Sequence, residues 1–193
     1  MFLSFCSLLQ KKLDNVLFFF LHSKWENLKK ELLFMADVTI GKTIWRDSDF
    51  VDSHGNKLFT WDEAVKNVPQ GYRLPEKKDF DDLIAQTQTY SSPGEALKSC
   101  SGWKNNIGCN NLKFNGEPAG YMFKHSNLKT SDKVRDEDVY ACYWSKDECS
   151  WEFQPNGGPS ENAYYYELSS LHNGLIRKLD DKRYRFSVRY VKK

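Results

Sequence analysis

Residues 71–84 read GYRLPEKKDFDDLI, and this stretch decides the fold. A short extended segment runs into Pro75, whose missing N–H costs nothing in the first turn of a helix. Glu76 and Asp79 place negative charge near the helix N-terminus, where the helix dipole favours it. The apolar face follows at i, i+3, i+4 and i+7 and consists of Phe80, Leu83, Ile84 and Thr87. We therefore predict a strand that leads directly into a helix over about 75–87.

A second helix is expected ahead of this junction. Thr60 and Glu63 form a capping box, in which each residue satisfies a backbone donor at the start of the helix. That helix is short and ends before Pro69. After residues 91–94, where Ser-Ser-Pro-Gly breaks the chain, no useful helical periodicity remains.

Strands are expected at both ends of the chain. Residues 38–45 read as one strand that Gly41 interrupts, and Asn173-Gly174 is a strong hairpin signal. The remaining strands are expected at 143–144, 163–168, 175–179 and 185–191. The order of elements favours an α+β domain without internal repeats.

Large apolar side chains indicate where the core lies. Those expected inside are Trp45, Trp61, Tyr72, Leu74, Phe80, Trp103 and Trp144. Arg73 is flanked by core residues, so we expect it to brace the structure by pairing with a carboxylate or with backbone carbonyls. Two charged groups are interpreted as solvated faces. They are Asp79, Asp81 and Asp82 on the helix and Arg183, Arg185 and Arg189 at strand spacing.

Several motifs together resemble the Fibrobacter succinogenes major paralogous domain family, in which a G-[WY]-R-L-P run precedes such a helix. The other similar stretches are residues 39–45, 58–64, 96–98 with 102–103, 114–121, 143–148, 162–165 and 186–192. The resemblance covers the chain from about Asp37 to the C-terminus. It implies a C-type lectin-like α+β fold and no established catalytic activity. In that fold two short helices come early, a loop-rich half with a small antiparallel sheet follows, and the terminal strands lie together.

Residues 1–34 lie outside that resemblance and are interpreted as a leader. Their apolar run, Leu17 to Leu21, is shorter than the roughly 20 residues that a membrane span needs. Lys29-Lys30-Glu31 must be encoded by a purine run, and Met35 follows at the spacing of a ribosome-binding site. We hypothesise that Met35 is the true start and that 35–193 is a single domain. A poorly formed signal or anchor is the alternative.

The charge balance gives no support to two classes of partner. The net charge is +2, and residues 1–34 contribute all of it because they hold five lysines and three acidic residues. Nothing in this balance favours nucleic acid or an anionic membrane.

The cysteine pattern is compatible with disulfides, with reduced thiols or with a zinc site. Cys100, Cys109, Cys142 and Cys149 allow three disulfide pairings, of which Cys100–Cys109 with Cys142–Cys149 is the simplest. A secreted domain would form them, whereas a chain that starts at Met35 has no export signal and would keep its thiols reduced. A zinc site is less favoured, since no CxxC pair is present.

The segment from Cys142 to Tyr166 is the candidate recognition surface, because aromatic and amide side chains alternate along it. The candidate ligand-binding residues are Trp151, Gln154, Asn156, Glu161, Asn162, Tyr164 and Tyr166. Gln154-Pro155-Asn156 resembles the calcium-binding tripeptide of C-type lectins, and Glu161 could add an oxygen ligand. The Trp-Asn-Asp half of that lectin site is missing, so a plain turn is the preferred reading and no cofactor is expected.

These observations favour a non-catalytic binding module. It would recognise a protein or glycan on a cell or particle surface, as an adhesin of a bacterial surface or a phage fibre or tail protein does. A structural subunit of a larger assembly is an alternative. An oxidase similar to the formylglycine-generating enzymes is less favoured, because Gly157-Gly158-Pro159 replaces their Gly-Gly-Ser-Trp segment and no cysteine follows Cys149.

Overall fold

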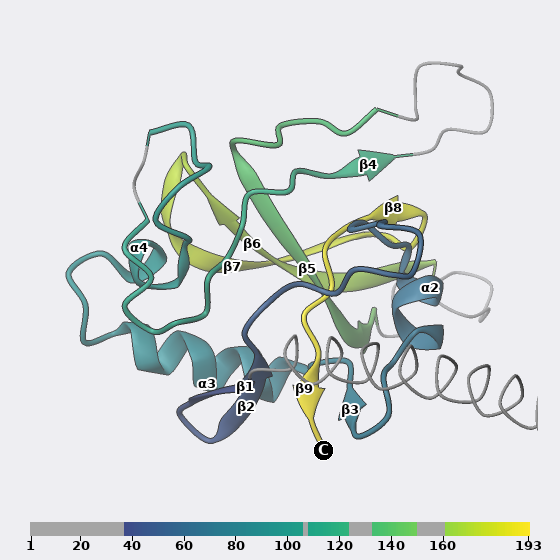
Figure 1. Cartoon of the computed structure of the whole chain (residues 1–193), viewed down its shortest axis with the longest axis horizontal. Helices are drawn as coiled ribbons and strands as arrows, with labels where there is room; N and C mark the ends of the chain where they lie inside the picture. Colours follow the sequence, from purple (N-terminus) through teal and green to yellow (C-terminus); the bar gives the residue numbers. More distant parts are fainter. Residues whose placement is uncertain (1–36, 106–107, 124–132, 150–160) are drawn as a thin grey trace, which may run out of the picture. The chain divides into compact units, whose positions relative to one another are not determined.

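The computed structural model describes residues 37–105, 108–123, 133–149 and 161–193. Within them a four-stranded sheet joins the two ends of the domain, with the strand order β1-β2-β9-β3 (Figure 1). Its strands are β1 Asp37–Ile40, β2 Thr43–Arg46, β9 Val191–Lys192 and β3 Tyr72–Arg73. All neighbours in this sheet are antiparallel. The first and last strands therefore lie together, and the fold is of the α+β class.

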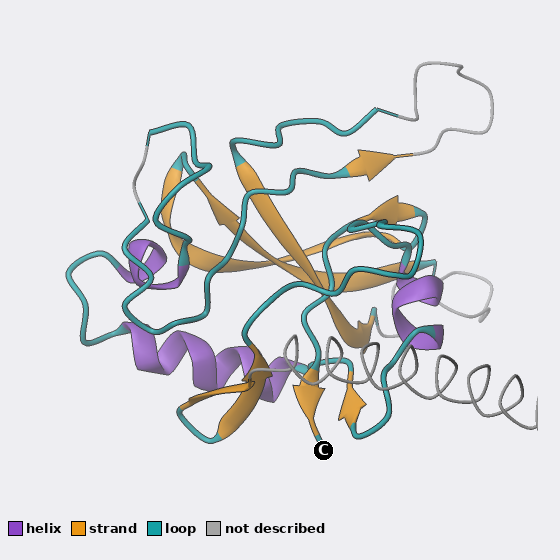
Figure 2. Cartoon of the chain, in the orientation of Figure 1, coloured by secondary structure: helices purple, strands orange, loops and turns teal. Residues whose placement is uncertain are grey.

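A second sheet forms the centre of the domain (Figure 2). It is antiparallel and consists of β5 Tyr140–Glu148, β6 Asn162–Ser169 and β7 His172–Asp181, in that order. A small ribbon pairs β4 Met122–Phe123 with β8 Tyr184–Arg185. β7 is the outer strand of the central sheet.

Three short helices are described, and two of them match the sequence. α2 spans Trp61–Lys66 and has the predicted capping box of Thr60 and Glu63. α3 spans Lys77–Thr87, so it begins two residues later than predicted. The reason is that the Pro75 carbonyl accepts a 2.8 Å hydrogen bond from Lys146 N in β5 instead of starting the helix. α4, Pro93–Leu97, was not predicted, since five residues are too few to show a period.

Two apolar clusters cover opposite faces of the central sheet. Side chains alternate along a strand, so Tyr166 and Leu168 of β6 join one cluster and Ala163 and Tyr165 join the other. The first cluster contains α3 and the second contains α2. Phe80 of α3 stacks on Tyr166 with 3.8 Å between ring centroids. All seven side chains predicted for the core are buried.

Two strand predictions were wrong in detail. Residues 38–45 form the β1–β2 hairpin, because Gly41 has φ +61° and turns the chain. This turn rests on α3, where Lys42 N donates a 2.6 Å hydrogen bond to the Asp82 carboxylate. Residues 185–191 are not one strand, since β8 ends at Arg185 and β9 begins at Val191, and between them only Phe186 and Ser187 form isolated bridges, to Phe59 and Tyr143.

The Asn173-Gly174 hairpin prediction was also wrong. The turn lies three residues earlier, because Ser169 pairs with His172 across Ser170 and Leu171. Asn173 and Gly174 lie within β7 and contact α4 instead. The Asn173 side chain accepts a 2.9 Å hydrogen bond from Gly94 N. A Cβ added at Gly94 would lie 2.9 Å from Gly174 N, so helix and strand need glycine at their contact.

The Gly71–Ile84 stretch is held by one ion pair. Arg73 donates to both carboxylate oxygens of Asp79, to Oδ1 at 2.7 Å and to Oδ2 at 2.5 Å. The same carboxylate accepts from Glu76 N at 2.8 Å and from the Thr43 hydroxyl at 3.5 Å. Arg73 is thus the expected brace, but Asp79 is buried and is not part of a solvated face.

This geometry predicts acid sensitivity. Burial by itself would raise the pKa of Asp79, but the bonds from Arg73 and Glu76 N hold that pKa below its usual value. A carboxylate whose folded pKa is lowered stabilises fully above its unfolded pKa of about 3.9, and this contribution is lost as pH falls through the folded pKa. Asp79→Asn should lower the free energy of unfolding at pH 7 by about 2–3 kcal/mol. The difference from wild type should shrink below about pH 4, as measured by urea unfolding across pH.

Asp81→Asn is the matched control, since Asp81 is half-exposed on the same helix and, among the described residues, forms an ion pair with Lys77 alone, at i, i+4. It should cost about 0.5 kcal/mol or less. Equal losses for the two variants would contradict the role given to Asp79.

Candidate functional site

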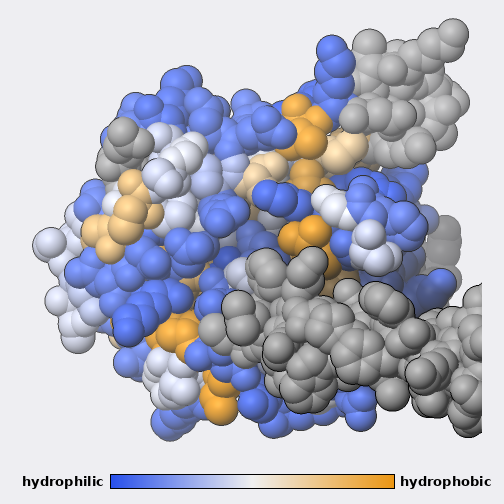
Figure 3. Space-filling model, viewed as in Figure 1, coloured by the Kyte–Doolittle hydropathy of each residue, from blue (hydrophilic) through white to orange (hydrophobic). Residues whose placement is uncertain are grey.

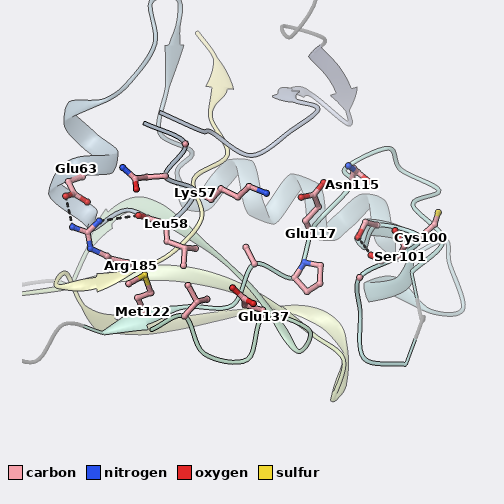
Figure 4. A pocket seen from close by; sticks show the side chains of 17 residues that line it. Lys57, Leu58, Glu63, Cys100, Ser101, Asn115, Glu117, Met122, Glu137 and Arg185 are labelled. Carbon is pink, nitrogen blue, oxygen red and sulfur yellow. Dashed lines mark hydrogen bonds and ion pairs between the residues drawn. The ribbon is translucent and has the colours of Figure 1, made fainter. Parts of the chain in front are cut away.

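A groove of about 1110 Å³ opens between loops at one side of the domain (Figure 4). Four segments line most of it, and they come from distant parts of the sequence. They are residues 55–58, 99–102, 117–119 with Asn115, and Val134 with Glu137. Glu63, Met122 and Arg185 complete the lining. Loops held by a rigid scaffold are the usual place for binding residues.

Charged groups of both signs line the groove. Arg185 donates to Glu63 at 2.8 Å and to the Leu58 carbonyl at 3.3 Å, and this pair closes one end. Lys57, Glu117 and Glu137 are exposed. In Figure 4 the Lys57 side chain points from one wall toward Glu117 on the other. The lining can therefore donate hydrogen bonds to a polar ligand and also accept them.

The backbone of the groove is held in special conformations. Gly55 and Gly102 have φ values of +83° and +91°, and Asn115 has φ +53° although it is not glycine. The Asn115 N–H is fixed by a 2.7 Å hydrogen bond to the Asn110 side chain. Glycine adopts such values without strain, whereas a non-glycine residue such as Asn115 is held there by its surroundings, and such residues concentrate at functional sites.

The turn that carries Gly55 is fixed by Asp52. Its carboxylate accepts from Asn56 Nδ2 at 2.8 Å and from the backbone N–H groups of Asn56 and His54 at 2.9 Å. The Asn56 side chain and these N–H groups lower the pKa of Asp52. Lys57 is therefore presented by an ordered turn.

A buried ion pair between Arg189 and Asp49 holds one wall of the groove in place. The guanidinium of Arg189 is fully buried and donates to Asp49 at 2.8 Å, to the Asn115 carbonyl at 3.3 Å and to the Phe114 carbonyl. Burial alone would lower the pKa of Arg189, but the Asp49 carboxylate raises it. The expectation that Arg189 lies on a solvated sheet face is therefore wrong. Its role is to anchor the wall at residues 114–117.

The described residues of the recognition surface predicted from the sequence do not line the groove. Trp151, Gln154 and Asn156 fall outside the described residues, so a calcium site at Gln154 and Asn156 stays a prediction. Glu161 is exposed, and Asn162 begins β6. Tyr164 stacks with Arg177 of β7, whose guanidinium carbon lies 3.5 Å from the ring centroid. None of these three residues lines the groove.

Tyr166 requires a correction. It is 1 % exposed and packs between the central sheet and α3, so its ring is part of the core and not of a ligand surface. Alternation along β6 places Tyr166 and Tyr164 on the same face, but only Tyr166 lies under α3.

The Cys142–Cys149 pairing is corrected by the structure, and none of the four cysteines of the described residues is bonded to another. Cys142 pairs with Glu167 on β6, and Cys149 N bonds to the Asn162 carbonyl five residues away along that strand. At strand spacing the two cysteines are roughly 15 Å apart, which no disulfide spans. Cys109 donates to the Glu95 carbonyl, while Cys100 lines the groove.

The sequence analysis missed Lys57, Glu117, Glu137 and the Arg185–Glu63 pair. A signal was present, since the groove segments are rich in Gly, Asn and Pro at turns. Ser53 to Asn56 and Phe114 to Gly120 are such turns, and both lie within or beside stretches that carry the family resemblance. Their proximity follows only from the three-dimensional fold.

Of three comparisons with known proteins, one gave a match, and it identifies a protein family. The Fibrobacter succinogenes major domain family matches residues 23–192. No curated protein and no solved structure matches the chain. Among the described helices none is long and apolar enough to cross a membrane. The described residues also contain no group of three or more His, Cys, Asp or Glu side chains that could hold a metal ion.

The thiols should differ sharply in reactivity. Burial raises the pKa of the Cys142 thiol well above its usual value, so this residue should resist alkylation in the native protein. Cys100 and Cys109 are exposed and should be alkylated without unfolding. Mass spectrometry of alkylated peptides checks this expectation. A peptide with Cys142 linked to Cys149 would contradict the structure.

Arg189→Met should lower the free energy of unfolding by about 3–5 kcal/mol, because it leaves Asp49 buried without its partner. It should also speed amide exchange at residues 115–117, which lose their anchor. Arg183→Met is the control, since Arg183 forms an exposed ion pair with Asp181 and should leave both quantities nearly unchanged. Equal effects of the two variants would exclude the anchoring role.

Proposed function

Because the chain belongs to the Fibrobacter succinogenes major domain family and carries an open polar groove, we propose that it is a non-catalytic binding module of C-type lectin-like fold. It recognises a protein or glycan on a cell or particle surface, such as the surface of a bacterium or a phage tail. The groove between residues 55–58, 99–102, 115–119 and 134–137 is its recognition site.

The single observation that carries the proposal is the composition of the groove. Its lining combines exposed Lys57, Glu117 and Glu137 with Ser99, Ser101 and backbone groups. Hydroxyl-rich glycans and polar peptide segments are bound by such mixtures of donors and acceptors. On the face shown in Figure 3 hydrophilic side chains predominate, and apolar ones gather only in small separate areas.

The arrangement of the strands supports the assignment to a C-type lectin-like fold. β2 near the start of the domain pairs with β9 at its end, and the loops that line the groove project from the elements between them. This is the arrangement expected of a C-type lectin-like domain, in which a closed scaffold presents variable loops. The Trp151–Tyr164 segment is the rival site for the same function.

The proposal is tested by a glycan-array and cell-surface binding screen of the full chain, with calcium and with chelator. Once a ligand is found, Lys57→Glu should weaken its binding about tenfold or more, because a charged hydrogen-bond donor is replaced by an acceptor of opposite charge. Lys104→Glu is the matched control, since Lys104 is also an exposed lysine but lies outside the groove.

A paired substitution of Trp151 and Tyr164 by alanine tests the rival site. Binding that survives this change but is lost with Lys57→Glu supports the groove. The reverse result would reject the groove and assign recognition to the other surface. Calcium-dependent ligand binding that is lost when Gln154 and Asn156 are replaced would also reject the groove and assign recognition to that surface. No binding to any surface would overturn the binding module and favour a structural subunit.

A further inference from the structure

Among the described residues, the outer strand of the central sheet has one edge that pairs with no other strand. β7 pairs with β6 along one side only. α4 contacts its first residues, where Asn173 bonds to Gly94. From Leu175 to Asp181 the described part of the chain shows no backbone hydrogen bond apart from those to β6. Residues 176–179 are all exposed, including Ile176 at 40 % and Leu179 at 42 %.

Charge is sorted along this edge. Arg177 and Lys178 precede Leu179, and Asp180 and Asp181 follow it. Charges on an edge strand usually prevent pairing. Here the two signs stand symmetrically about Leu179, so a strand that runs in the opposite direction through the same centre would meet opposite charges.

Symmetry restricts how two copies can pair. In a two-fold antiparallel pair the axis is perpendicular to the sheet, so both copies show the same face on the same side. Each residue must then lie opposite one of the same parity. With the axis at Leu179, Lys178 faces Asp180 of the second copy and Arg177 faces its Asp181. With the axis at Lys178 or Asp180, two like charges meet at the centre, which is destabilising.

We propose that β7 is a homodimer interface, in which two copies of this chain join edge to edge through an antiparallel β7–β7 pair centred on Leu179. The two three-stranded sheets then form one continuous six-stranded sheet. Four cross-strand ion pairs flank a central Leu179–Leu179 contact. The interface is independent of the groove, so either assignment can fail alone.

The state of Asp180 is consistent with this pairing. Its burial raises its pKa, and its own chain supplies a backbone hydrogen bond from Asp181 N at 2.9 Å. Lys178 is already bound to Glu167 at 2.7 Å in the single chain, but it is 42 % exposed and retains further donors. In the proposed dimer, Lys178 can therefore bond to Glu167 of its own chain and to Asp180 of the second copy.

Sedimentation velocity of the full chain tests the proposal. Wild type should form a dimer, and Leu179→Asp should raise the dimer dissociation constant about tenfold or more, because two like charges meet at the axis. Leu171→Asp is the matched control. Leu171 is 70 % exposed but lies in the β6–β7 turn, outside the paired segment.

A cross-link tests the register independently of stability. Residues opposite each other in an antiparallel pair have Cα atoms about 4.5–5.5 Å apart, within the range that a disulfide bridges. With Cys6, Cys100 and Cys109 replaced by serine, Leu179→Cys should form a covalent dimer under mild oxidation and Leu171→Cys should not. A monomeric wild type, equal behaviour of the two aspartate variants, or absence of the Leu179→Cys dimer would overturn the proposal.

Discussion

The Arg73–Asp79 ion pair is the interaction on which the rest of the domain depends. Its carboxylate is shared by β3, the first turn of α3 and the start of β2, so it fixes the helix against the sheet that joins the two ends of the chain. α3 then places Phe80 on Tyr166 of the central sheet. One buried carboxylate therefore determines how the two sheets share a core.

The groove is a consequence of the same scaffold. Phe114 packs edge-on against Trp45 of β2 and Tyr143 of β5, with centroids 5.4 Å and 5.5 Å away. Arg189 lies over the Phe114 ring and holds the carbonyls of the next loop. The wall at Asn115–Glu117 is thus anchored in the core while its side chains remain available to a ligand.

The sequence predicted the interactions that are local or carried by strong periodicity. Thr60 and Glu63 are three residues apart, and this spacing is the signature of a capping box. Arg73 is expected from its core neighbours to be a brace, but Asp79 is assigned to a solvated face, because its burial follows only from the packing of α3 against β2 and β3. Arg189 and Asp49 are 140 residues apart, and nothing near Arg189 indicates its partner. The turn predicted at Asn173-Gly174 was wrong, because the contact of these residues with Gly94 outweighed their local preference for a turn. The groove could not be predicted for the same reason, since its walls are neighbours only in the folded chain.

The central claim is that recognition occurs in the groove, and mapping a bound ligand by amide chemical shifts tests it most directly. The shifts should change at residues 55–57, 99–102 and 115–119, with little change at 161–165. Changes confined to 161–165 and to the residues that precede them would contradict the account and place recognition on the segment first indicated by the sequence.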